Sequence, residues 1–190
     1  MRPNNRAKIL DAAARVVGRA GLRALTLEAT AEEAGLTRGG MMYHFRDRDA
    51  LVLALHEHLA AEWEAQLVAA AGKPADQATA DERIAAYARA TSEDASAAEF
   101  ALLVDSAHDP RFAQIWAAVQ HRWSPSPAEA STDPAALDRF VLRLAADGLW
   151  AYDAFDAEPL APEFRRQVAE RITSLLGPDA AQDNSGRAPR

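Results

Sequence analysis

Residues 26–48 (TLEATAEEAGLTRGGMMYHFRDR) carry the start and stop signals of two helices separated by a tight turn. Thr26 is a residue type that caps helix N-termini, and an apolar stripe at helical spacing begins directly after it. Gly35 supplies the left-handed residue that ends such a helix. Thr37 then caps a second helix over residues 38–45. The spacing predicts a helix-turn-helix.

The second of these helices contains two consecutive glycines, Gly39 and Gly40. Each lowers helix stability by roughly 1 kcal/mol relative to alanine, so their presence requires a compensating role. The DNA major groove is about 12 Å wide, and a helix that enters it benefits from small residues where its backbone approaches the bases. The glycines therefore indicate a DNA-reading helix. Met41 and Phe45 are expected to face the core instead.

Together these residues resemble the TetR family of bacterial transcriptional repressors. The resemblance spans about a quarter of the chain: a helix over 5–20, the Gly21 turn, Thr26, Ala34-Gly35, Thr37-Arg38-Gly39-Gly40, Tyr43-His44-Phe45, Arg48 and a hydrophobic helix that follows. One departure is Thr30, where the family usually has an aliphatic residue. Its hydroxyl is expected to bond a carbonyl one turn earlier. The resemblance implies an all-α fold of about nine helices, with a three-helix DNA-binding domain before a ligand-binding and dimerisation domain.

The DNA contacts are carried over from the family to the matching positions. The resemblance implies phosphate contacts, which position the domain without reading sequence, at Thr26, Thr37, Tyr43, His44 and Arg48. It implies base-edge contacts at Arg38, Gly39, Gly40 and Met42. An arginine can pair with guanine through two hydrogen bonds. His44 has an alternative role as a cap for a neighbouring group.

Charge is distributed unevenly along the chain. Residues 1–48 hold nine Lys or Arg and five acidic residues, a net charge of about +4. Since the whole chain has a net charge of −7, the remaining residues carry about −11. A basic head concentrates phosphate attraction where DNA would bind, and an acidic remainder suppresses non-specific association. An ordinary uneven surface is the alternative explanation.

Several function classes are disfavoured by what the sequence lacks. There is no cysteine, which excludes disulfides and Cys-based zinc sites, and His56 and His58 point apart on a helix and cannot share a metal. No hydrolase or phosphate-binding motif is present, so we expect no catalytic residues, no metal and no cofactor. No window is apolar enough for a membrane span or signal peptide, which predicts no membrane partner and a cytoplasmic location. The alternatives are an enzyme or an interaction protein that does not bind DNA.

The spacing of apolar residues after residue 48 predicts further helices. A long helix capped by Asp47 runs to about residue 71, and others begin at Thr79 or Asp81, near residue 95, and at three prolines, Pro110, Pro134 and Pro162. Residues 124–133 are predicted to be a loop. The predicted domains are the DNA-binding domain at 1–48, the ligand-binding and dimerisation domain at 49–177, and a disordered tail at 178–190.

The last two long helices have more apolar surface than an isolated pair needs. The resemblance implies that they form a four-helix bundle with a second copy, through Leu137, Val141, Leu144, Gly148, Phe164, Val168 and Ile172. Burial within one subunit is the alternative.

The second domain is expected to contain a ligand pocket, since members of this family respond to small molecules. The candidate residues are Trp63, Phe100, Val104, Asp105, His108, Trp116, Trp123, Asp147 and Trp150. Aromatic walls with occasional acids suit flat apolar or cationic ligands. Alternatively, aromatic residues at helical spacing are typical of a hydrophobic core, and Asp105 and Asp147 are ordinary solvated residues. The sequence predicts a homodimeric, ligand-responsive repressor of a palindromic operator, and leaves open its effector, its operator, the regulated genes and whether it activates instead.

Overall fold

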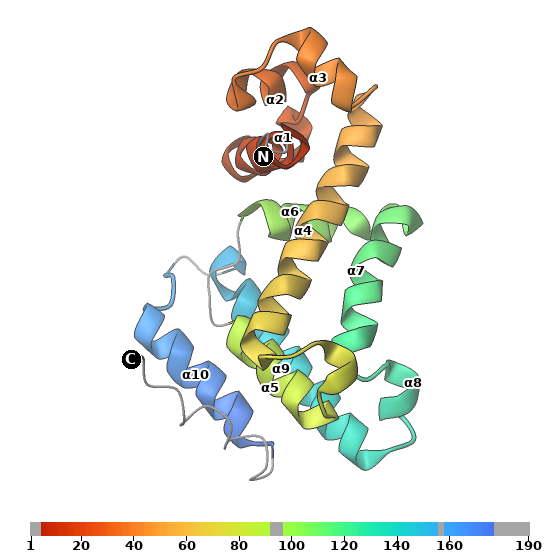
Figure 1. Cartoon of the computed structure of the whole chain (residues 1–190). Coiled ribbons are helices and arrows are strands. Elements are labelled where there is room, and N and C mark those ends of the chain that lie inside the picture. The colour runs from red at the N-terminus through yellow and green to blue at the C-terminus, as the bar shows by residue number, and fades with distance from the viewer. Residues whose placement is uncertain (1–4, 92–96, 156–157, 177–190) are drawn as a thin grey trace, which may run out of the picture. The chain divides into compact units, whose positions relative to one another are not determined.

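The computed structural model describes residues 5–91, 97–155 and 158–176 (Figure 1). Over these residues the regular structure consists of ten α-helices and two 3-10 helices, with no strand among them. The predicted all-α fold is confirmed. None of the described helices is long and apolar enough to cross a membrane. The tail predicted to be disordered, 178–190, lies outside the described residues.

The chain divides into two compact units. The first unit comprises residues 1–63 and 96–117, and the second comprises residues 64–95 and 118–190. Two helices, α4 (Arg48–Ala71) and α7 (Pro110–Trp123), contribute residues to both units. The first unit therefore contains more than the helix-turn-helix, because later residues of the chain pack against it.

The first unit begins with α1 (Asn5–Ala20), the 3-10 helix η1 (Leu22–Ala24), α2 (Leu27–Ala34) and α3 (Arg38–His44), and also contains α6 (Ala97–Ser106). The predicted caps are present: the Thr26 hydroxyl accepts a hydrogen bond from the Ala29 amide at 3.0 Å. Gly35 ends α2 in the left-handed region, with φ of 67°. Asp47 caps α4 by accepting from the Ala50 amide at 2.8 Å.

The core of the first unit lies on the apolar face of α1. This helix packs against α2 on the helix-turn-helix side and against α6 from the later segment (Figure 1). Its fully or almost fully buried side chains are Ile9, Leu10, Ala12, Ala13, Val16 and Val17. Thr30 is also fully buried, and its hydroxyl donates to the Thr26 carbonyl at 2.8 Å, as expected.

The second unit is built from η2 (Ala75–Gln77), α5 (Ala80–Ala90), α8 (Pro127–Ala130), α9 (Pro134–Phe155) and α10 (Pro162–Ser174). Helices α5, α9 and α10 pack against one another (Figure 1). Thr79 starts α5 through a reciprocal capping box with Glu82. The prediction of an unbroken loop over 124–133 is wrong, because Ser126 and Glu129 form the same kind of capping box and start the short helix α8.

A polar cluster lies between α5 and α9, with Tyr87 buried and Arg143 and Asp147 partly exposed. The Tyr87 hydroxyl donates to Asp147 Oδ1 at 2.7 Å, and Arg143 Nε lies 2.8 Å from Asp147 Oδ2. Burial raises the pKa of the Asp147 carboxyl, although Arg143 and Tyr87 oppose this shift. Burial also raises the pKa of the Tyr87 hydroxyl, which therefore stays protonated and able to donate. The carboxylate predicted to face a ligand is thus satisfied by its own chain.

Candidate nucleic-acid interface and ligand cavity

Helix α3 presents one buried face and one exposed face. Met41 and Phe45 are almost fully buried and anchor the helix, which confirms their predicted place in the core. On the other face, Met42 is 50% exposed and Tyr43 is 85% exposed. The Arg38 side chain is 75% exposed and lies 3.6 Å from Glu28, which is also exposed, so solvent weakens this ion pair. The predicted DNA-reading face is therefore free for a partner.

The two glycines of α3 have no steric requirement inside the chain. A Cβ atom added at Gly39 would meet nothing within 4 Å, and one added at Gly40 would lie 3.4 Å from the Thr37 hydroxyl, close to ordinary contact. Neither residue has a positive φ. Since folding does not demand glycine at Gly39, the smallness of that position supports close approach by an external partner.

The proposed phosphate contacts have different surroundings in the structure. Thr37 accepts a hydrogen bond from the Gly40 amide at 3.1 Å, so its hydroxyl proton remains available to a phosphate, as does that of Thr26. The half-buried His44 ring lies edge-on to Tyr43, with ring centroids 5.1 Å apart. Tyr43 is the most exposed of these side chains.

Arg48 has an internal role that the sequence pattern did not reveal. Its Nε atom donates to the Leu25 carbonyl at 2.7 Å, and one Nη atom donates to the Leu22 carbonyl at 2.8 Å. Leu22 begins η1 and Leu25 directly follows it, so the guanidinium ties the connection between α1 and α2 to the first residue of α4. The interpretation of Arg48 as purely a phosphate contact is therefore incomplete.

A cavity of about 470 Å³ lies within the first unit. It is lined by Ala20, Gly21, Leu22, Arg23, Arg48, Asp49, Val52, Ala101, Val104, Asp105, His108 and Phe112. Three of the predicted ligand-binding residues, Val104, Asp105 and His108, meet here. Phe112 and Val52 also line this cavity, although neither was among the predicted ligand residues. Only the fold shows that they face this cavity as well as the core.

The buried His56 packs against Phe112, one of the residues that line the cavity. The buried His56 ring stacks on Phe112, with centroids 4.2 Å apart, and its Nδ1 atom accepts a hydrogen bond from Trp116 Nε1 at 3.0 Å. That bond places the proton of the neutral ring on Nε2, which lies 3.7 Å from Asp105 Oδ2. Burial lowers the pKa of His56, although Asp105 opposes the shift.

Asp105 is the carboxylate of this cavity that has no lysine or arginine side chain as an ion-pair partner among the described residues. Its neighbour Asp49 is paired with Arg111 at 3.0 Å, and Asp109 is paired with the same guanidinium at 2.7 Å. Within the described residues Asp105 forms no ion pair with lysine or arginine. Arg23 also lines the cavity, which therefore offers a carboxylate and a guanidinium to a ligand.

The other predicted ligand residues do not join this cavity. Trp116 is buried in the core of the first unit, while Trp123 is fully buried and borders a separate cavity of about 280 Å³ in the second unit. Trp63, Phe100 and Trp150 are half-buried. Asp147 is paired with Arg143 and Tyr87 of its own chain and lines neither of these cavities.

An exposed apolar stripe runs along α9. Leu137, Val141 and Leu144 are each about half exposed, and Gly148 continues the same helical spacing at the surface. On α10, Phe164 is 53% exposed and Val168 is half-buried. Ile172 differs from the prediction, because it is buried within the second unit. Leu175, absent from the predicted set, is 58% exposed.

The regular structure of the described residues is helical, and the second helix of the helix-turn-helix carries two glycines and has an exposed face. The same unit holds a cavity large enough for a small molecule. This combination is typical of a DNA-binding transcriptional regulator. The family domain described as "Bacterial regulatory proteins, tetR family" matches residues 9–55. The domain described as "Tetracyclin repressor-like, C-terminal domain" matches residues 81–177, about half of the chain. The chain belongs to the TetR family, whose members are transcription factors with a DNA-binding domain and a C-terminal ligand-binding domain, not enzymes.

Named relatives agree with this assignment. The HTH-type transcriptional regulator BetI of Cronobacter sakazakii is 27% identical over 203 residues, covering 100% of this chain and 95% of the relative. BetI of Burkholderia mallei is 29% identical over 190 residues, covering 94% and 96%. The multidrug binding protein EbrR complexed with ethidium has a TM-score of 0.56 at 28% identity, covering 90% and 99%. A putative TetR-family regulator from Rhodococcus sp. shares the fold, with a TM-score of 0.69 at 20% identity, covering 90% and 98%.

Replacing Arg48 with alanine is expected to lower the stability of the first unit as well as DNA affinity. Two hydrogen bonds from a charged donor are lost, at roughly 1.5–3 kcal/mol for each such bond, although exposure of the side chain reduces this value. Arg46→Ala is the matched control, because the Arg46 side chain is 85% exposed and its recorded partner is Asp47. Urea unfolding of both variants distinguishes the roles. Equal stability of the two variants would show that the hydrogen bonds of Arg48 do not stabilise the first unit.

Proposed function

We propose that this regulator is a ligand-responsive repressor that binds a palindromic operator as a homodimer and is released by a small hydrophobic effector, with flat cations as the preferred class. The observation that carries the proposal is the exposed face of α3, where Arg38, Met42 and Tyr43 project from a helix anchored by Met41 and Phe45. A helix held on one face and free on the other can enter a major groove without unfolding.

Dimerisation is supported by the apolar stripe of α9. Its members recur at intervals of three and four residues from Leu137 to Gly148, so they lie on one face of the helix. A contiguous exposed apolar face of this kind favours association. A two-fold dimer brings the same surface of each copy together and presents two recognition helices. Such helices fit successive major grooves only when they are about 34–36 Å apart, or a multiple of this distance.

The effector class is proposed from the cavity in the first unit. Phe112 and Val52 provide apolar wall, and Asp105 provides a carboxylate that no lysine or arginine neutralises among the described residues. A planar cation would gain both apolar contact and a charged partner there. EbrR, to which this chain is similar, is a multidrug binding protein with structures bound to ethidium and to proflavin, both flat aromatic cations.

Release from DNA is proposed to result from effector binding in this cavity, because residues that flank the helix-turn-helix line it. Leu22 and Arg48 both line it, and they are joined by the hydrogen bond that ties η1 to the start of α4. An effector that binds the cavity better when this connection shifts would move the segments that flank the helix-turn-helix. The shift is limited by the difference in its affinity for the two states, since equal binding to both would change nothing.

Arg38→Ala is expected to relax preference at one base position of the operator, at a cost of roughly 1–3 kcal/mol. Tyr43→Phe is expected to weaken binding to all sequences about equally, since phosphate contacts carry no sequence information. Fluorescence anisotropy with cognate and scrambled duplexes at several salt concentrations measures both effects. Equal loss on the two duplexes would assign Arg38 to the backbone. Wild-type affinity that does not fall with salt would favour an interaction protein that does not bind DNA.

Leu144→Glu is expected to convert the dimer to a monomer and to abolish operator binding, because an unpaired charge would be buried at the interface. Ala128→Glu introduces the same charge at an exposed position of α8 and serves as the control. Sedimentation velocity reports the mass of each variant. A Leu144→Glu protein that remains dimeric would place the interface elsewhere.

Asp105→Asn is expected to weaken binding of ethidium or proflavin by roughly ten- to hundredfold, the equivalent of the 1.5–3 kcal/mol that a charged contact contributes. Asp76→Asn, an exposed residue in η2, is the matched control. Dye titration by anisotropy gives the affinities, and the same dyes should release operator DNA from the wild type. Release by aromatic carboxylates but not by the dyes would reverse the proposed charge preference and implicate Arg23.

A further inference from the structure

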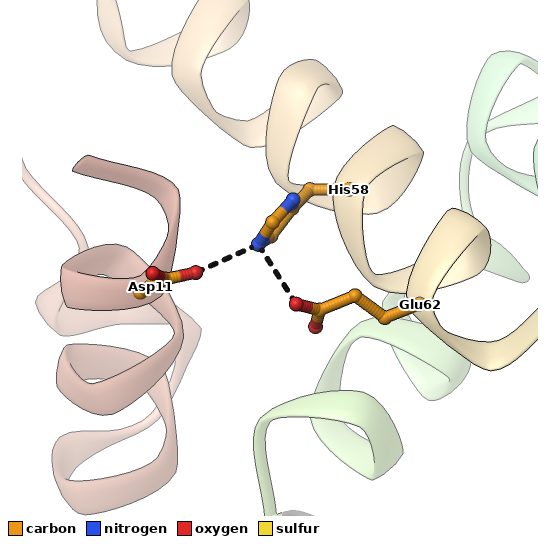
Figure 2. Close-up of side chains that lie close together, drawn as sticks. All are labelled: Asp11, His58 and Glu62. Atoms are coloured by element: carbon orange, nitrogen blue, oxygen red, sulfur yellow. Dashed lines mark hydrogen bonds and ion pairs between the residues drawn. The ribbon is translucent and has the colours of Figure 1, made fainter. Parts of the chain in front are cut away.

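Asp11, His58 and Glu62 bring three metal-ligating atoms together on the surface of the first unit. Figure 2 shows the His58 ring between the two carboxylates, with Asp11 on α1 and the other two residues on α4. His58 Nε2 lies 2.9 Å from Asp11 Oδ1 and 3.3 Å from Glu62 Oε1. All three donor atoms lie within 4.8 Å of one another. None of these residues belongs to α3 or lines the cavity described above.

The local helix geometry explains why the donors converge. His58 and Glu62 are four residues apart on α4 and therefore share one face. The same spacing places two ligands of a metal ion on one helix in established zinc motifs. Asp11 adds a third donor from a segment 47 residues away in sequence, which the packing of the first unit brings alongside.

The charges of the cluster are unbalanced in favour of a cation. Neither Asp11 nor Glu62 forms an ion pair with lysine or arginine within the described ranges. The nearby Arg15, one turn after Asp11, is bound instead to Glu33 at 2.8 Å. Two carboxylates are thus held close together with only an imidazole between them. A divalent ion would neutralise both.

The donor set selects the kind of ion. One imidazole nitrogen with two carboxylate oxygens suits borderline divalent transition metals, whereas magnesium and calcium prefer oxygen ligands alone. Zinc binds nitrogen and oxygen at about 2.0–2.2 Å in tetrahedral sites, so its ligand atoms lie about 3.4 Å apart. The contacts of 2.9 and 3.3 Å approach this separation. Ligation therefore requires the His58 nitrogen to move away from the two carboxylates by up to about half an ångström. The Asp11 and Glu62 oxygens, which lie within 4.8 Å of each other, must settle at the same separation.

We propose that Asp11, His58 and Glu62 form a site for a single divalent transition-metal ion of the zinc class. Three protein ligands leave a fourth position for water, and the partial exposure of all three side chains gives the ion access from solvent. The bound ion links α1 to α4 and stabilises the first unit. This inference does not depend on the proposed repressor function.

The site also explains why sequence reasoning predicted no metal. That expectation rested on His56 and His58, which point apart on α4. The structure agrees, since His56 is buried against Trp116 and His58 faces Asp11. The ligands that complete the site lie one turn along α4 and on another helix.

The test uses the full chain, stripped with EDTA and titrated with zinc chloride in a calorimeter. Wild-type protein should bind one equivalent of zinc at this site, and thermal unfolding should shift upward in its presence, because the ion binds the folded state. Glu62→Gln and His58→Gln should each weaken the uptake by at least about tenfold, since loss of an outer-shell partner alone costs roughly 10–100-fold. Cobalt absorption in the visible range gives an independent readout of ligation.

Matched controls separate this site from adventitious binding. Glu57→Gln removes an exposed carboxylate from the same helix, and His121→Gln removes an exposed imidazole from α7. Both should bind zinc like the wild type. Circular dichroism confirms that each variant is folded. The proposal is overturned if the wild type binds neither zinc nor cobalt at millimolar concentration, or if Glu62→Gln and His58→Gln bind as tightly as the controls.

Discussion

The apolar face of α1 is the constraint on which the first unit depends. It packs against α2 and α6, so one buried stripe from Ile9 to Val17 supports both the helix-turn-helix and a helix from much later in the chain. The end of α1 borders the cavity of the first unit, and Asp11 of α1 contacts His58 of α4. Loss of a large side chain from this stripe would therefore disturb the reading helix and the cavity together.

Electrostatic contacts refine what this apolar packing begins. Arg15 and Arg19 of α1 both bind Glu33 of α2, and their hydrogen bonds lower the pKa of that carboxyl. Arg48 fixes the connection between the same two helices by donating to backbone carbonyls instead of a carboxylate. These contacts are accessible to solvent, so each contributes modestly to stability. Their value lies in orienting α2 and α3 relative to α1.

Local signals made much of the fold predictable. Thr26, Gly35 and Thr37 mark helix ends by hydrogen bonds and backbone angles that depend only on neighbours in sequence, and the structure has these caps. Pro110, Pro134 and Pro162 each begin a helix as predicted. The recognition helix was equally clear, because its two glycines contradict helix propensity. The short α8 was missed because a capping box followed by one turn of helix gives no periodicity.

Contacts between distant residues could not be predicted in the same way. Nothing in the sequence pairs Tyr87 with Asp147, Arg48 with the η1 carbonyls, or Asp11 with His58, because each pair is created by packing. For the same reason, the predicted ligand residues do not all meet in one cavity. Aromatic residues at helical spacing look alike whether they face a core or a cavity, so Trp116 and Trp123 could not be separated from Phe112.

The polar cluster of Tyr87, Arg143 and Asp147 limits how the sequence of the second unit can change. The buried Tyr87 hydroxyl donates to Asp147, and the partly exposed Asp147 forms an ion pair with Arg143, so replacing one member alone leaves another without its partner. Apolar substitutes become acceptable only when all three change together. Sequence drift or laboratory evolution of this module should therefore carry the three positions as an inherited block. A chimera that joins α5 of one homologue to α9 of another should fold only when both supply the same version of that block.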